Sequence, residues 1–218
     1  MMPLPPGLKN RILVAVEEEP SATRQEALIQ TAITAIAGTV AALGLFFLLG
    51  GFHRGSRPVP FVVATAAGSA LVAVVAAWGA FGRGHSMLGR SRHLLLAITI
   101  ATPLVLFAWI ALWNVVYPET QAVWPGRIGL RCLVLSLAMT AWPLAVLTRL
   151  RREKNPTHPG LTGAARGSAI GSLAWVLVDL WCPIANPAHI VLGHALPLVI
   201  LSMYGAWIGS RMMGVRAR

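Results

Sequence analysis

Acidic residues are scarce in this 218-residue chain, which has seven Asp and Glu residues against 18 Lys and Arg. Proton-coupled transport normally needs ionisable groups inside the membrane-spanning helices, so this scarcity argues against it. A GxSxG elbow, a P-loop, an HExxH motif and a dinucleotide fingerprint are all missing as well. Each of these motifs is typical of a large enzyme class. We therefore expect a protein without enzymatic activity and without a required cofactor.

Cysteine is equally rare, since Cys132 and Cys182 are the only two. A membrane thiol oxidoreductase normally uses more than two isolated cysteines. Neither CxxC nor HxxxH spacing is present, so no strong metal-binding motif can be identified along the chain. No short apolar segment of the signal-peptide type precedes the first long apolar run.

Long apolar runs, in contrast, make up most of the chain, which is 56% hydrophobic and only 11% charged. Six runs of about 20 residues are each long enough to cross a hydrocarbon core roughly 30 Å thick. The sequence therefore predicts an all-α integral membrane protein, a bundle of six transmembrane helices with short loops. The predicted spans are Gln30–Phe52, Val59–Phe81, Leu94–Val116, Ile128–Thr148, Leu161–Trp181 and Ala188–Ser210.

The positive charges indicate how this bundle is oriented. If the N-terminus is cytoplasmic, thirteen Lys and Arg residues fall in cytoplasmic segments and three, Arg54, Arg57 and Arg127, fall outside. This split follows the positive-inside rule and places both termini in the cytoplasm. It divides the chain into a cytoplasmic arm (1–29), the bundle (30–210) and a basic tail (211–218). The net charge of +11 then fits topology and anionic lipid, and we expect a lipid bilayer and no direct nucleic-acid partner.

The arm has the pattern of a short amphipathic helix. Its apolar residues recur at helical spacing, and three consecutive acids follow them. A helix of about 12 residues is marginal in water, so it is expected to order on a partner or on the membrane surface. The acids favour a protein partner, because a helix on anionic lipid is usually basic. The residues concerned are Leu8, Ile12, Leu13, Val16, Glu17, Glu18 and Glu19.

Glycines recur every fourth residue in the fifth predicted span, at Gly163, Gly167 and Gly171, and again at Gly205 and Gly209 in the sixth. This spacing aligns them on one helix face, where a neighbouring backbone can approach closely. It predicts helix packing rather than chemistry.

The topology brings Cys132 and Cys182 to the same outer face, near His189 and His194. Such a pair can form a disulfide, be oxidised or bind a soft metal ion, with the histidines as additional ligands. A plainer interpretation is that the cysteines are small buried apolar residues and the histidines are hydrated at the interface. Asp179 lies a turn below this level, and an acid inside a membrane is usually paired or functional. Arg131 is its expected partner, and Arg166 is a second candidate near the opposite end.

The C-terminal third resembles the NrsF-type six-span bacterial anti-sigma factors. The resemblance rests on the glycine run after Pro159-Gly160-Leu161, and on Asp179-Leu-Trp-Cys182-Pro183, Asn186-Pro187-Ala-His189, His194 and Gly205-Ala-Trp-Ile-Gly209-Ser-Arg211. The arm's Pro-Pro-Gly-Leu-Lys-Asn-Arg-Ile-Leu, the chain length and the two cysteines are also similar to that family.

The resemblance implies an inner-membrane protein that sequesters an extracytoplasmic-function sigma factor through its arm and releases it on an envelope signal. Cys132 and Cys182 would be the sensor pair, for oxidants or heavy metals. In the similarly built carotenoid-controlling proteins of myxobacteria, the signal is light acting through singlet oxygen. Two other classes, a small six-span transporter or channel and a structural membrane subunit, stay open from the sequence, and no small-molecule substrate is indicated.

Overall fold

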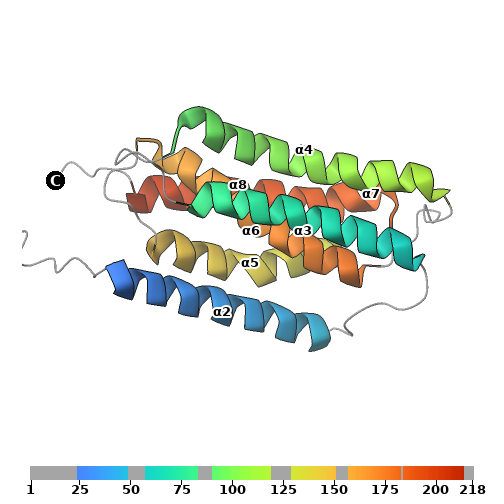
Figure 1. Cartoon of the computed structure of the whole chain (residues 1–218), viewed down its shortest axis with the longest axis horizontal. Coiled ribbons are helices and arrows are strands. Elements are labelled where there is room, and N and C mark those ends of the chain that lie inside the picture. Colours follow the sequence, from blue (N-terminus) through green and yellow to red (C-terminus); the bar gives the residue numbers. More distant parts are fainter. Residues whose placement is uncertain are drawn as a thin grey trace, which may run out of the picture.

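The computed structural model describes residues 24–48, 57–82, 90–118, 129–150, 157–182 and 184–213, and all regular structure in these ranges is helical. The prediction of an all-α protein is therefore confirmed. The helices run nearly parallel to one axis (Figure 1). In chain order they are α2 (Arg24–Leu48), α3 (Val59–Phe81), α4 (Arg92–Val116), α5 (Leu130–Leu150), α6 (Pro159–Trp181), α7 (Pro187–Ile190), the π-helical turn η2 (Val191–Ala195) and α8 (Leu196–Met213).

Among the described residues, five helices are long and apolar enough to cross a membrane: α3, α4, α5, α6 and the continuous segment Pro187–Met213. The apolar part of α2 is shorter and covers Ala32–Leu48. Large apolar side chains on the outside of the bundle, such as Val63, Leu104 and Val134, are more than half exposed. Such a surface suits contact with lipid, because lipid tails impose no penalty on exposed apolar groups.

The predicted spans locate the helices well, and the differences lie at their polar ends. Val59–Phe81 is reproduced without change, whereas the first helix occupies Arg24–Leu48 instead of Gln30–Phe52. Residues 24–29, which the sequence assigns to the arm, are thus already helical. Hydropathy detects only the apolar part of a helix, while an acid such as Glu26 stabilises the first turn through the helix dipole.

Successive long helices alternate in direction, so the bundle has two distinct ends (Figure 1). The start of α2 and the end of α8 lie together at one end, which we call the arm end. The start of α5, the end of α6 and the short helix α7 lie at the other, which we call the distal end. The residues that carry candidate chemistry are therefore separated from the start of α2 by the length of the bundle.

Helix α6 occupies the centre of the bundle. Within its most apolar stretch 78% of the residues are buried, against 28% in each of α3, α4 and α5. It packs against α3, α4, α5 and α8. Its composition explains this position, since a helix rich in Gly, Ala and Ser has a small diameter and admits neighbours on every side.

Helices α6 and α8 approach so closely that their glycines replace side chains at the contact. A Cβ atom added at Gly163 would lie 1.9 Å from the carbonyl oxygen of Gly205, and one at Gly167 would lie 2.2 Å from that of Leu201. Beside these glycines the Ser168 and Ser202 hydroxyls form a hydrogen bond of 2.8 Å across the contact. The fourfold glycine spacing thus lies at the closest helix pair of the fold.

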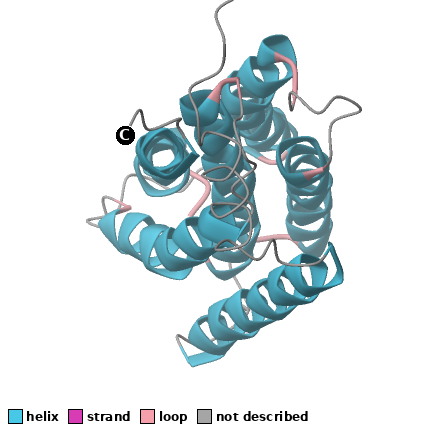
Figure 2. Cartoon of the chain, turned by 90° about the vertical axis from the view of Figure 1, so that its left-hand side faces the viewer, coloured by secondary structure: helices cyan, strands magenta, loops and turns pink. Residues whose placement is uncertain are grey.

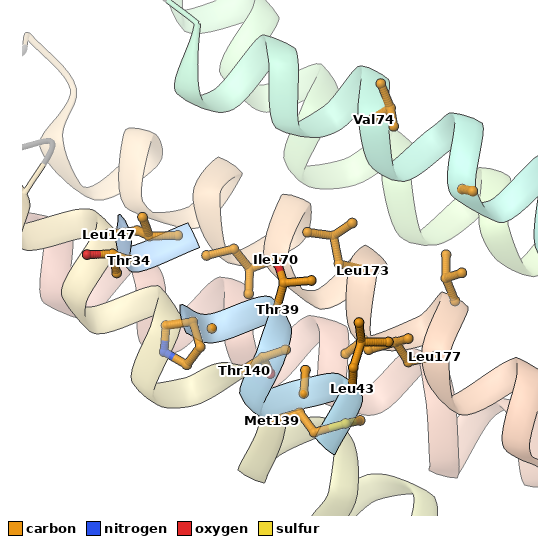
Figure 3. Close-up of a pocket in the computed structure, with 16 residues that line it drawn as sticks. Thr34, Thr39, Leu43, Val74, Met139, Thr140, Leu147, Ile170, Leu173 and Leu177 are labelled. Atoms are coloured by element: carbon orange, nitrogen blue, oxygen red, sulfur yellow. The ribbon is translucent and has the colours of Figure 1, made fainter. Parts of the chain in front are cut away.

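Helix α2 lies at the periphery, at the lower edge of the bundle in Figure 2. Its main neighbour among the described helices is α5. Gly38 of α2 faces Pro143 of α5, where an added Cβ atom would meet the proline ring at 3.4 Å. A groove of about 290 Å³ separates α2 from α3 and α6, and Figure 3 shows its walls, with Leu43, Val74 and Leu173 among the apolar side chains.

Candidate functional site

Four potential metal ligands converge at the distal end of the bundle: Cys132, Cys182, His189 and His194. Their sulfur and ring nitrogen atoms all lie within 4.8 Å of one another. Each residue is at most 3% exposed. We call this group the Cys/His cluster. Its members come from the start of α5, the end of α6, α7 and η2. The sequence predicts only that they lie at a similar depth near the same membrane face.

His189 is the central member of the Cys/His cluster. Its Nε2 atom lies 3.2 Å from Sγ of Cys182 and 3.5 Å from Sγ of Cys132. The Cys182 thiol also donates a long hydrogen bond of 3.8 Å to the carbonyl oxygen of Ile184. Both cysteines are free thiols in this structure. One imidazole nitrogen therefore bridges the two thiols without a disulfide between them.

His194 is buried, yet neither of its ring nitrogens has a hydrogen-bond partner among the described residues. Its ring packs edge-on against Trp175 and His189, with centroid distances of 5.5 and 5.8 Å. An imidazole loses hydration on burial, and leaving its polar atoms unpaired costs about 1–3 kcal/mol. A buried, unpaired nitrogen beside two thiols is typical of a ligand position.

The π turn η2 explains why the two histidines face the same way. In an α-helix, residues five apart point about 140° away from each other, because each residue turns the chain by about 100°. In η2 the N–H of Leu196 bonds to the carbonyl of Val191, a spacing of five residues that brings His189 and His194 into register. Pro197 follows directly and has no N–H to offer an α-helical bond. The sequence did not reveal this geometry, because two histidines five residues apart lack the HxxxH spacing that places both on one face of an α-helix.

Two glycines that the sequence analysis did not single out fit the start of α5 against η2. Gly129 has a φ of +86°, in the left-handed region that favours glycine. A Cβ atom there would lie 3.1 Å from both the Gly193 nitrogen and the His189 carbonyl oxygen. At Gly193 it would lie 3.0 Å from the Cβ atom of Cys132. In the sequence, Gly129 and Gly193 stand shortly before Cys132 and His194, and this position was the available sign of a close contact at the cluster.

The chain between Cys182 and His189 is held by two amide side chains. Asn114 of α4, which is buried, donates a 2.9 Å hydrogen bond to the carbonyl oxygen of Ala185. Asn186 caps α7 by accepting a 3.0 Å bond from the Ala188 N–H. These bonds fix the segment that positions His189.

Asp179 is paired with Arg57, so the expectation of Arg131 as its partner was wrong. Arg57 Nη1 lies 3.2 Å from Asp179 Oδ1, and both side chains are 5% exposed. The second guanidinium nitrogen of Arg57 donates to the Asp179 backbone carbonyl. Arg131 instead lies over the Trp181 ring, 4.8 Å from its centroid. The error arose because Arg57 precedes α3 and only the packing of α3 on α6 brings it to Asp179.

The second candidate partner, Arg166, lies near the arm end. It is buried, donates a 3.3 Å bond to the Met213 sulfur and lies 5.5 Å from the Phe81 ring centroid. The arm residues Leu8, Ile12, Leu13, Val16 and Glu17–Glu19 lie outside the described residues. No contact is assigned to them.

Together these observations define a class: a helical membrane protein whose buried thiols and imidazoles lie at the end opposite the start of its first described helix, α2. A family model described as "Negative regulator of sigma F" (NrsF) matches residues 15–214, and the chain belongs to this family. Membership of a family of regulators agrees with the expectation that the protein is not an enzyme.

One relative is the "Anti-sigma-F factor NrsF" of Caulobacter vibrioides (strain NA1000 / CB15N), which is 37% identical over 79 residues. The matched stretch covers 36% of this chain and 35% of that relative. No solved structure matches the chain.

Proposed function

We propose that this protein is an anti-sigma factor of the bacterial inner membrane. It holds an extracytoplasmic-function sigma factor through its N-terminal arm, residues 1–29, and releases it on an envelope signal. The observation that carries the proposal is the family match over residues 15–214. The name of the Caulobacter relative supports it.

Both termini are proposed to be cytoplasmic, and α2 is proposed to cross the membrane together with the five helices that are long and apolar enough to do so. The thirteen-to-three distribution of basic residues supports this orientation. The arm then lies on the same side as the transcription machinery. Its apolar face offers a helix to a groove of the sigma factor, and Glu17–Glu19 complement the basic surface of a DNA-binding partner.

The proposed signal acts at the Cys/His cluster, where redox chemistry, a metal or singlet oxygen can each modify a thiol. Cys132 lies on α5, and α5 is the main neighbour of α2, the helix into which the arm continues. A change at Cys132 therefore reaches the arm through two packed helices. The contact between Gly38 and the Pro143 ring is part of this path.

The arm is tested by deleting residues 1–20 and measuring whether a co-expressed sigma factor still co-purifies with membranes. Retention is expected to fall to background, because the apolar face is removed while every described helix stays. Deletion of residues 214–218 is the matched control and is expected to leave retention unchanged. Undiminished retention after the arm deletion would rule out the arm as the main docking element.

A finer variant keeps the chain length. Replacing Leu8, Ile12 and Leu13 by serine removes the apolar face but preserves the acids, whereas replacing Glu17–Glu19 by glutamine does the reverse. If apolar burial dominates, the serine variant loses retention at all salt concentrations. If charge contributes mainly to the association rate, the glutamine variant binds more slowly, most visibly at low salt.

A further inference from the structure

We propose that Cys132, Cys182, His189 and His194 form a tetrahedral site for a divalent d10 cation such as Zn²⁺ or Cd²⁺. The site is argued from the geometry of the cluster and does not rest on the proposed anti-sigma function.

The spacing of the cluster matches a tetrahedral metal site. With metal–sulfur bonds of about 2.3 Å and metal–nitrogen bonds of about 2.0–2.1 Å, sulfur and nitrogen ligands lie about 3.5 Å apart and two sulfurs about 3.8 Å apart. The two sulfur–nitrogen distances of 3.2 and 3.5 Å agree with this geometry. The remaining pairs lie within 4.8 Å and need to contract by at most about 1.5 Å.

The environment of His194 distinguishes a metal site from two thiols that merely pack beside a histidine. Both of its ring nitrogens are buried without a hydrogen bond among the described residues. The π turn keeps this imidazole at the cluster instead of at the surface. A bound cation would satisfy one nitrogen and so recover part of the cost of burying the ring.

Charge selects the ion. When a divalent cation binds, each thiol loses one proton to water, and two thiolates with two neutral imidazoles form a site of zero net charge. A neutral complex is the one that a buried location tolerates best. The nearby ions Arg57 and Asp179 already neutralise each other. Thiolate and imidazole ligands also disfavour Mg²⁺ and Ca²⁺, and d10 ions impose no geometry that conflicts with a tetrahedron.

The ligands connect three separate parts of the fold, which gives binding a mechanical consequence. Cys132 belongs to α5, Cys182 follows α6, and the histidines belong to the segment that continues into α8. Contraction around an ion draws the distal end of α5 toward η2, against Gly129 and Gly193. Because α2 packs on α5, the same movement changes the position of the helix that leads into the arm.

The binding site is tested with the full-length protein, reduced and purified in detergent, by titration with Co²⁺ as a spectroscopic probe. Binding of one ion per chain is expected, with the visible ligand-field bands of a tetrahedral site and a thiolate charge-transfer band. Zn²⁺ and Cd²⁺ are expected to displace the Co²⁺. An octahedral spectrum, or no binding, would overturn the proposal.

His194→Phe is the decisive variant, because phenylalanine keeps the ring that packs on Trp175 but removes the ligand. Affinity is expected to fall by at least about 100-fold, since loss of even an outer-shell partner typically costs 10–100-fold. Without metal the variant should unfold no more easily than the parent, because no hydrogen bond is lost. His93→Phe, at an exposed position near the arm end, is the matched control and should bind normally.

Metal binding that is unaffected by His194→Phe would show that the thiols act alone and would refute the four-ligand site. Because the titration uses the purified protein alone, its outcome is independent of whether the protein binds a sigma factor.

Discussion

The contact between α6 and α8 yields a prediction whose size follows from the structure. Gly163→Ala adds one methyl group where the added carbon would lie 1.9 Å from the carbonyl oxygen of Gly205. Ordinary contacts of this kind begin at 3.4 Å, so the two backbones must separate by about 1.5 Å. Neither helix can avoid the contact by changing a side-chain rotamer, because the obstacle is backbone.

Forced separation of a well-packed contact typically costs about 1–3 kcal/mol. The higher helix propensity of alanine offsets up to about 1 kcal/mol of this cost. We expect Gly163→Ala to lower the free energy of unfolding by about 2 kcal/mol, which is the upper end of the overpacking cost reduced by the gain in helix propensity. Gly167→Ala, with the Leu201 carbonyl oxygen at 2.2 Å, should be similar.

Two further glycines complete a graded series. At Gly171 an added Cβ atom would lie 3.1 Å from Cγ and 3.2 Å from Cα of Leu198, so the helices need to shift by only a few tenths of an ångström and Gly171→Ala should cost much less than Gly163→Ala. At Gly44 of α2 nothing lies within 4 Å, and Gly44→Ala should be neutral or stabilising by up to about 1 kcal/mol. Gly44 is thus the matched control for adding a methyl group to a helix.

The series is measured by SDS-induced unfolding of the purified protein in mixed micelles, followed by circular dichroism and tryptophan fluorescence. The expected order of stability is Gly44→Ala, then Gly171→Ala, then Gly167→Ala and Gly163→Ala together. If Gly163→Ala is as stable as the parent protein, the close approach of α6 and α8 is refuted. If Gly163→Ala and Gly44→Ala both lose the same amount of stability, the effect is not specific to this contact.

Three other predictions concern the distal end. Asp179→Asn leaves the Arg57 guanidinium buried without its counter-ion, and a loss of about 3–5 kcal/mol is expected in SDS unfolding; a loss below 1 kcal/mol would show that the pair is hydrated. Gly129→Ala forces a side chain into the left-handed region at about 1–2 kcal/mol, and it should also weaken Co²⁺ binding; unchanged affinity would separate this turn from the cluster. Cys132→Ser or Cys182→Ser should change the response of sigma-factor release to oxidant or metal while retention persists; parental responses in both would make the cysteines packing residues.

The sequence specified the helices because hydropathy and helix length depend on local composition. The run Val59–Phe81 is a helix with the same bounds in the structure. The order of the spans also alternates their directions, which was enough to place both cysteines at the same end. Residues 24–29 show the limit of this reasoning, because a polar helical turn has no hydropathy signal.

Contacts between helices required the tertiary structure. The partner of Asp179 is 122 residues away along the chain, whereas the sequence favoured Arg131 because of its level in the membrane. Only the packing of α3 on α6 selects Arg57. In the same way, a small-residue composition permits a central helix, but the burial of α6 on all sides follows from its neighbours.

Both the sequence and the tertiary structure were needed to identify the Cys/His cluster. The scarcity of cysteine in the sequence drew attention to Cys132 and Cys182, with His189 and His194 near the same level. Their convergence depends on a π turn before Pro197 and on glycine contacts between α5 and η2. Those features arise from three-dimensional packing, which selects one backbone geometry among several that the local sequence permits. The sequence by itself thus determined which side chains are available, and the tertiary structure decided that they meet.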